Sequence, residues 1–206
     1  NFLMANISCV LFDLGGVIVN WHNSWLIQDV SDEFQLQKEK LSKEFYKNLP
    51  EISTGRINEK EFWHTIGKEL ESKKLMNLNE SLLDKIFRKR CSLNNSMISL
   101  SKELSQKDIT VGILSNTEPA SYSVMENLTS LDHFEYKFLS YNIGHLKPEP
   151  EIYHHVIDHI PFPKEELFFI DDLKSNVESA RSEGIDSVQY NDYDELLKEC
   201  QIRKIM

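Results

Sequence analysis

Three acidic residues and one lysine stand out in this chain because of the sequences around them. Asp13 follows the apolar run CVLF, Asp171 and Asp172 follow LFFI, and Lys147 lies in the stretch LKPEP. Carboxylates that lie within a few ångströms of one another raise each other's pKa, and one lysine supplies too little charge to offset three of them. If these side chains meet, either some of them are protonated or a cation lies among them, and a hard divalent cation is the natural solution.

Magnesium is the cation that suits such oxygen ligands best. Mg²⁺ prefers carboxylate, carbonyl and water oxygens, and it usually shares its coordination sphere with a substrate phosphate. Two glycines, Gly15 and Gly16, allow a sharp turn that presents backbone N–H groups to an anion. Ser115 and Asn116 follow the apolar run VGIL. A helix after Ser115 would add N–H donors to its hydroxyl, so the pattern predicts a phosphate-binding site.

In a site of this kind Asp13 is the candidate nucleophile. Attack of its carboxylate on phosphorus would give an aspartyl-phosphate intermediate. A metal ion and Lys147 would stabilise the charge on the transferring oxygens. His22 is close enough to Asp13 in the sequence to be a candidate substrate contact.

Short apolar runs alternate with helical patterns, which predicts a parallel sheet covered by helices. The predicted strands are Cys9–Phe12, Thr110–Leu114, Lys137–Leu139, Leu167–Ile170 and Ser187–Tyr190. The predicted helices between them include Asn95–Gln106, Glu118–Asn127, Pro150–His159 and Ser175–Ser182. In open α/β sheets ligands bind at the carboxyl ends of the strands, where most of the polar residues above are expected. We therefore expect these distant segments to converge on one site.

One long segment, Trp21 to Arg90, interrupts this alternation and reads as helices only. In it, Phe62, Ile66 and Leu70 form an amphipathic stripe, and Asn58 with Glu61 matches a capping box. The fold class predicted is α/β, with a Rossmann-like parallel sheet core and a helical cap inserted after the first strand. The expected core comprises residues 1–20 and 91–206, and the expected cap comprises residues 21–90.

The stretches DLGGV, LSN, KP and DD occur in the order of the four signature motifs of the haloacid dehalogenase-like (HAD) hydrolase superfamily, which the chain resembles. The resemblance implies that Asp13 is the nucleophile and first metal ligand, and that the backbone carbonyl of Gly15 also binds Mg²⁺. It implies that Ser115 and Lys147 bind phosphate. Asp172 would be the second metal ligand, with Asp171 beside it.

The run DDLKSN, which includes Asn176, resembles the bacterial branch that contains sugar-phosphate phosphatases such as alpha-D-glucose-1-phosphate phosphatase. One departure is Gly15, because phosphatases of the superfamily usually carry there a second aspartate that protonates the leaving group. General acid–base assistance contributes roughly 10²–10⁴-fold to a rate. A good leaving group depends less on it, and His22 or another cap side chain is a candidate replacement.

The predicted function is Mg²⁺-dependent hydrolysis of a small phosphomonoester, with a sugar phosphate as the leading substrate class. One alternative is a degenerate scaffold that binds phosphate without turnover because of Gly15. A second is a haloacid dehalogenase, which attacks carbon without a metal ion; the Asp171–Asp172 pair argues against it. Response-regulator receivers also combine acids, a hydroxyl and a lysine, but their acidic pair precedes the phosphorylated aspartate.

Composition narrows the class of protein further. The net charge of −10 argues against a nucleic-acid partner, and three widely spaced cysteines argue against a disulfide framework. No apolar run reaches the roughly 18 residues that span a membrane, and the N-terminus lacks the features of a secretory signal. We expect a cytoplasmic monomer or homodimer, with Met4 as a candidate natural start.

Overall fold

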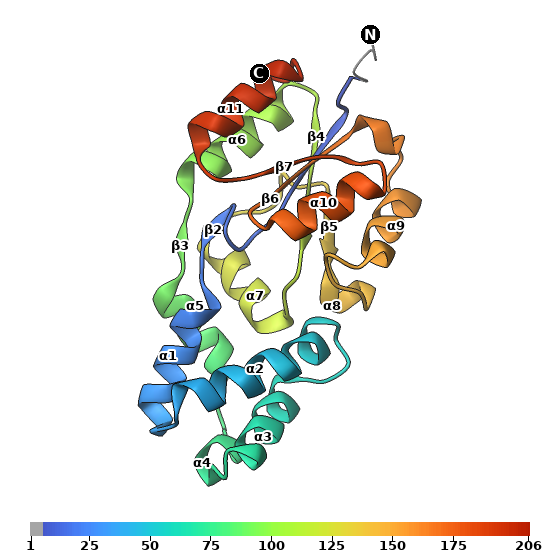
Figure 1. Ribbon diagram of the computed structural model, residues 1–206. Coiled ribbons are helices and arrows are strands. Elements are labelled where there is room, and N and C mark those ends of the chain that lie inside the picture. The colour runs from blue at the N-terminus through green and yellow to red at the C-terminus, as the bar shows by residue number, and fades with distance from the viewer. Residues whose placement is uncertain (1–5) are drawn as a thin grey trace.

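The computed structural model describes residues 6–206, in which five parallel strands form one sheet in the order β5-β4-β1-β6-β7 (Figure 1). The strands are β1 (Cys9–Phe12), β4 (Thr110–Ser115), β5 (Tyr136–Leu139), β6 (Leu167–Asp171) and β7 (Asp186–Gln189). Each strand lies within one residue of its predicted bounds, and the predicted α/β class is confirmed. The chain leaves β1 for β4 and β5 on one side and later returns to β6 on the other.

Helices cover both faces of this sheet because both faces of its strands are apolar. Along β1, Val10 and Phe12 pack on one face and Cys9 and Leu11 on the other, all without solvent exposure. The first face is covered by α6 (Asn95–Gln106), α7 (Pro119–Leu128) and α11 (Tyr193–Ile202). The second face is covered by α9 (Pro150–His159) and α10 (Lys174–Ser182). Two short helical elements complete the core. α8 (Ser140–Ile143) directly follows β5, and η1 (Lys164–Glu166) directly precedes β6.

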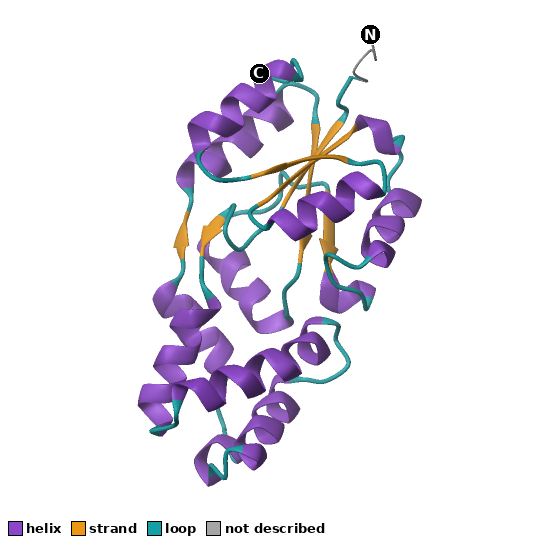
Figure 2. Cartoon of the chain, in the orientation of Figure 1, coloured by secondary structure: helices purple, strands orange, loops and turns teal. Residues whose placement is uncertain are grey.

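A separate group of helices lies beyond one end of the sheet, between residues 21 and 90 (Figure 2). These inserted helices are α1 (Asn23–Phe34), α2 (Lys38–Ser53), α3 (Glu59–Glu69), α4 (Lys73–Met76) and α5 (Leu82–Arg90). They enclose an apolar cluster of their own, in which Phe45, Phe62 and Trp63 are the largest side chains. The predicted capping box is present at the start of α3, where Asn58 and Glu61 bind each other's backbone N–H groups.

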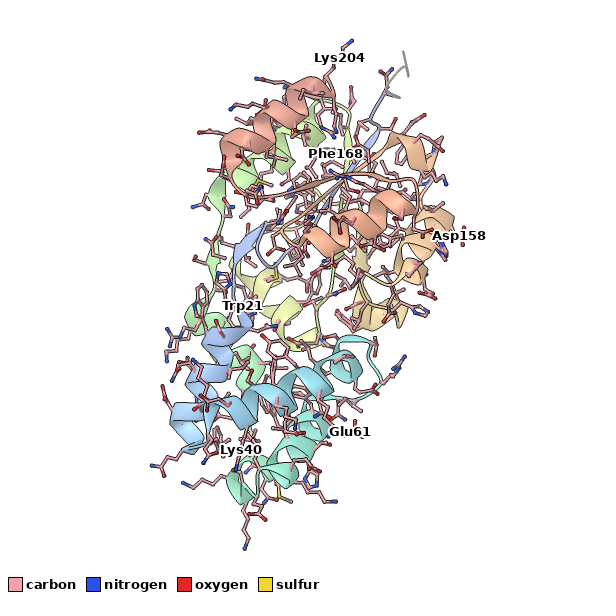
Figure 3. The ribbon with its side chains drawn as sticks, in the orientation of Figure 1. Trp21, Lys40, Glu61, Asp158, Phe168 and Lys204 are labelled. Carbon is pink, nitrogen blue, oxygen red and sulfur yellow. The ribbon has the colours of Figure 1, made fainter. Side chains whose placement is uncertain are left out.

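Two short strands that the sequence did not predict join the inserted helices to the sheet. β2 (Val19–Asn20) pairs antiparallel with β3 (Ser92–Leu93), so the outgoing and returning chain lie side by side. A strand of two residues is too short to show an alternating apolar pattern, which is why the sequence gives no sign of it. Trp21, labelled in Figure 3, lies where β2 passes into α1, with its ring 4.7 Å from that of Phe87.

Other sequence-based expectations concern the cysteines, the membrane and the start of the chain. Cys9, Cys91 and Cys200 are all free thiols, as expected. Among the described residues there is no helix with both the length and the apolar character required to cross a bilayer. The interpretation of Met4 concerns a residue outside the described part of the chain.

Candidate active site at the carboxyl end of the sheet

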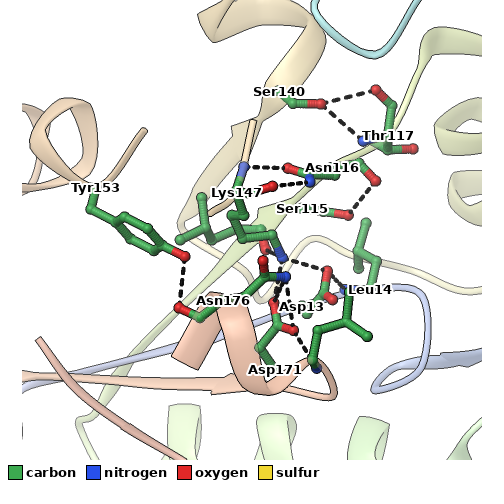
Figure 4. Close-up of polar contacts among 12 residues, drawn as sticks. Asp13, Leu14, Ser115, Asn116, Thr117, Ser140, Lys147, Tyr153, Asp171 and Asn176 are labelled. Carbon is green, nitrogen blue, oxygen red and sulfur yellow. Dashed lines mark hydrogen bonds and ion pairs between the residues drawn. The ribbon is translucent and has the colours of Figure 1, made fainter. Parts of the chain in front are cut away.

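Lys147 lies between two of the aspartates that follow the strands. Its Nζ is 3.0 Å from Oδ1 of Asp13, at the end of β1, and 2.6 Å from Oδ2 of Asp171, at the end of β6 (Figure 4). It also donates a hydrogen bond of 2.9 Å to the backbone carbonyl of Leu114 in β4. The ammonium group therefore joins the three central strands of the sheet, and it does so while buried.

Asp171 is held on all sides by hydrogen bonds. Both of its carboxylate oxygens lie 3.1 Å from Nδ2 of Asn176, and Oδ1 also accepts a bond of 2.8 Å from the backbone N–H of Leu173. Its side chain has no solvent exposure, whereas Asp172 is only half-buried. Asp171 is therefore placed to fix Lys147, and Asp172 is the more accessible of the pair.

Oxygens of Asp13, Asp171 and Asp172 all lie within 4.8 Å of one another. Gly16 makes this possible: its φ of +84° is unfavourable for other residues, and a Cβ there would lie 2.2 Å from Oδ2 of Asp172. From its sequence context, Gly16 is expected to turn the backbone toward an anion. In the structure this glycine has a different effect, because it leaves the space that the Asp172 carboxylate occupies.

Burial and mutual repulsion make these carboxylates hard to ionise. Burial, with a contribution from Asp171, raises the pKa of Asp13 to about 8, although Lys147 opposes the change. Burial and the neighbouring Asp171 also raise the pKa of Asp172. Burial alone would lower the pKa of Lys147, but the carboxylates outweigh it and raise that pKa. A set of carboxylate oxygens with this excess of negative charge fits a hard divalent cation, which would favour the ionised forms.

Asn116 has a structural role that its sequence context does not predict. Its Nδ2 donates to the backbone carbonyl of Lys147, and its Oδ1 accepts from the backbone N–H of Lys147, both at 2.9 Å. These two bonds fix the loop that carries Lys147 to the end of β4. The buried Ser115 precedes Asn116, and its hydroxyl lies 3.4 Å from the carbonyl oxygen of Asn116.

The prediction that a helix following Ser115 offers its N–H groups to a phosphate is wrong. Helix α7 begins only at Pro119, and Glu118 caps it by accepting hydrogen bonds from the backbone N–H groups of Ala120 and Ser121. Burial raises the pKa of Glu118. The N-terminus of α7 is therefore occupied by the protein's own carboxylate, and Ser115, Asn116 and Thr117 of the segment before it line the neighbouring cavity.

A cavity of about 650 Å³ opens between this cluster and the inserted helices. Asp13, Gly15, Ser115, Lys147 and Asp172 line one part of it, together with Asn116, and His22 lines it from the start of α1. At Gly15 a Cβ would meet only Trp21, at 3.9 Å, so the space for a side chain is there but the acid is not. His22 is exposed, with its ring 4.9 Å from that of Trp25.

The family model of haloacid dehalogenase-like hydrolases matches residues 10–190, which includes every element that forms this site. The chain belongs to this family. A solved HAD family enzyme from Bacteroides thetaiotaomicron has the same fold, with a TM-score of 0.80 and 25% identity over 94% of this chain and 99% of that one. The same enzyme has been solved in complex with magnesium and inorganic phosphate, with a TM-score of 0.76 and 26% identity over 92% of this chain and 98% of that one.

Curated proteins with similar sequences include an epoxide hydrolase and a phosphatase. The rat bifunctional epoxide hydrolase 2 is 25% identical over 92% of this chain. The chain spans 37% of that protein's length and 21% of the mouse protein of the same name. The sesquiterpene phosphatase astK of Aspergillus oryzae is 24% identical, and the match covers 92% of this chain and 93% of that protein.

Proposed function

We propose that this HAD-like hydrolase is a Mg²⁺-dependent phosphatase of a small phosphomonoester. The observation that carries the proposal is the meeting of three carboxylates within 4.8 Å of one another beside Lys147, which lies 3.0 Å from Asp13. An oxygen-only cluster of this charge suits Mg²⁺. The Bacteroides relative that has been solved with magnesium and inorganic phosphate adds support.

In the proposed reaction Asp13 is the nucleophile. A carboxylate oxygen of Asp13 forms a bond to phosphorus while the bond from phosphorus to the leaving oxygen breaks. Water then attacks the phosphorus of the aspartyl-phosphate, which releases inorganic phosphate and restores the carboxylate. Lys147 stabilises negative charge on Asp13 and on the transferring oxygens, and the Ser115 hydroxyl binds the phosphate.

The metal ion would be held by Asp13 and Asp172, with the backbone carbonyl of Gly15. When bound, it would supply the positive charge that the phosphate oxygens require during transfer. Asp171 would act from outside this set by fixing Lys147. His22 is the candidate substrate contact from the inserted helices, and it is also the candidate proton donor to the leaving group where Gly15 offers none.

The inserted helices would act as a cap over the site, with residues 21–90 as the cap and residues 1–20 and 91–206 as the core. This division is supported by the separate apolar cluster of the helices and by the β2–β3 pairing at their base. Closure of such a cap would exclude bulk water during attack by Asp13 and admit water for hydrolysis of the intermediate.

We predict that Asp13→Asn abolishes phosphate release, because an amide cannot form the aspartyl-phosphate. The measurement is inorganic phosphate released from a panel of phosphomonoesters, including sugar phosphates, with Mg²⁺ and with chelator. Asp158→Asn, an exposed aspartate on α9, is the matched control and should retain full activity. Thermal unfolding of both variants checks that the fold is intact.

Three results would contradict this proposal in different ways. Full turnover by Asp13→Asn would remove Asp13 as nucleophile. If the wild-type protein turned over no phosphomonoester but bound inorganic phosphate with Mg²⁺, the degenerate scaffold that Gly15 favours would replace the phosphatase. Undiminished dehalogenation of a haloacid in the presence of chelator would favour a dehalogenase.

A further inference from the structure

The cavity beside the acidic cluster has two chemically different ends. The end formed by Asp13, Ser115, Lys147 and Asp172 is polar and charged. The opposite end is formed by the inserted helices, whose accessible apolar side chains there are Trp21, Tyr46, Leu49 and Pro50, with buried side chains of the helices' own core behind them. The cavity volume of about 650 Å³ is in the range that accommodates a small organic molecule.

The inserted helices contribute no acidic, lysine or arginine side chain to the lining of this cavity, among the residues that the structure describes. Their polar lining residues are His22, Asn23, Tyr46 and Ser53. The side-chain oxygen of Asn23 already accepts a hydrogen bond from the indole N–H of Trp21. A sugar carries a hydroxyl on most of its carbons, and burial of a hydroxyl without a hydrogen-bond partner is unfavourable. This wall therefore offers few partners to a sugar.

Large apolar side chains also stand exposed at this cavity. In the described part of the chain, the large hydrophobic residues with marked exposure are Tyr46, Leu128, Leu173 and Ile202. Tyr46, on α2, is 51% exposed and Leu173, beside Asp172, is 55% exposed, and both line the cavity. Exposed apolar groups that line one cavity from both the inserted helices and the sheet side favour an apolar occupant.

We propose that the substrate is a phosphomonoester with a predominantly hydrocarbon body. Its phosphate would lie at Asp13, Lys147 and Ser115, and its hydrocarbon body would lie against Trp21, Tyr46 and Leu173 and the apolar wall of the inserted helices. This inference rests on the proposed phosphatase function and narrows its substrate class. It differs from the sugar phosphate expected from the sequence.

The test is the kcat/KM of a series of unbranched alkyl phosphates, from methyl to octyl phosphate, with glucose 6-phosphate as the polar comparison. All are esters of primary alcohols or methanol, so their leaving groups are similar. Differences in kcat/KM among the longer members therefore reflect contacts of the hydrocarbon chain and not the chemistry of the leaving group. Each added methylene that enters an apolar site should raise kcat/KM by roughly three- to fourfold until the cavity is filled. Octyl phosphate should exceed glucose 6-phosphate by at least about tenfold on the same basis.

Binding of methyl-, butyl- and octylphosphonate in the presence of Mg²⁺, measured by calorimetry, gives a readout that needs no turnover. A flat alkyl series with efficient turnover of glucose 6-phosphate would overturn the hydrocarbon body and leave the phosphatase in place. Absence of turnover of every ester would overturn the phosphatase. In that case phosphonate affinity that rises with chain length would still support the apolar site, and affinity that does not rise would overturn it.

Variants of the exposed lining residues test whether these side chains cause the dependence of kcat/KM on alkyl chain length. Tyr46→Ser and Leu173→Ser should each lower the ratio of octyl to methyl phosphate kcat/KM by severalfold. Ile202→Ser is the matched control, because Ile202 is 56% exposed but lies on α11 outside the cavity. Its ratio should equal that of the wild type. If all three variants kept the wild-type ratio, the body of the substrate would lie elsewhere.

Discussion

At the scale of single residues, the site depends on groups that bind each other as much as on groups that face a substrate. The three contacts of the Lys147 ammonium, with Asp13, Asp171 and the carbonyl of Leu114, hold the loop lysine at the centre of the sheet edge. Removal of a buried charge that is paired in this way leaves its partners uncompensated, which is more harmful than loss of a surface ion pair.

Gly16 gives a residue-scale prediction with a close internal control. Gly16 and Gly144 both have a φ of +84°, but a Cβ at Gly144 would meet nothing within 4 Å. Alanine at either position should cost about 1–2 kcal/mol in free energy of unfolding through backbone strain. Gly16→Ala alone should also displace the Asp172 carboxylate. The Mg²⁺ concentration needed for half-maximal phosphate release should therefore rise by at least about tenfold. Removal of a group that orients a metal ligand typically has an effect of this size. Urea denaturation and Mg²⁺ titration measure the two effects, and equal Mg²⁺ dependence in the two variants would refute the role of Gly16.

At the scale of elements, the parallel strands were predictable and the short pieces between them were not. Each core strand is an apolar run bounded by polar or turn residues. This pattern lies within a few neighbouring positions, so it can be recognised from the sequence alone. The start of α7 was placed too early because Glu118 reads as a helical residue, whereas its carboxylate caps the helix from outside. The Asn116–Lys147 pairing joins residues that are distant in the sequence, so no local pattern reports it.

The contact between α1 and α5 gives a prediction about pH. Asp29, on α1, accepts hydrogen bonds from Arg90 and Lys89 at the end of α5, and the hydrogen bond from Arg90 lowers its pKa below the ordinary value. The unfolded chain therefore binds a proton at Asp29 more readily than the folded chain. The stabilisation is present above the ordinary carboxyl pKa and is lost as the pH falls through the lowered pKa of the folded protein.

Asp29→Asn should accordingly be less stable than the wild type near neutral pH, and the difference should shrink as the pH falls toward 3. Thermal unfolding followed between pH 3 and pH 7 measures this. Asp132→Asn serves as the control, because Asp132 is exposed and accepts a hydrogen bond from the neutral hydroxyl of Ser130. A difference between the wild type and Asp29→Asn that stayed constant with pH would contradict the assignment.

At the scale of the whole molecule, the metal proposed for the site should affect folding as well as catalysis. A ligand that binds only the folded state stabilises it by about 2.7 kcal/mol at a concentration of 100 times Kd. For a chain of this size that corresponds to a rise in Tm of roughly 5–10 °C. We predict such a rise on addition of Mg²⁺ and its reversal by chelator, and no rise in Asp172→Asn, which lacks one of the proposed metal ligands. An equal rise in the wild type and in Asp172→Asn would place the Mg²⁺ elsewhere.

The β2–β3 pairing has a consequence for how such a protein can vary. Because Asn20 and Ser92 are paired, the two ends of the segment between them lie side by side. A different segment whose two ends also lie side by side could replace it at this junction. The strands that carry Asp13, Ser115 and Asp171 would then keep their positions. If the proposed function holds, substrate choice in the inserted helices and bond-breaking chemistry at the sheet can therefore evolve separately.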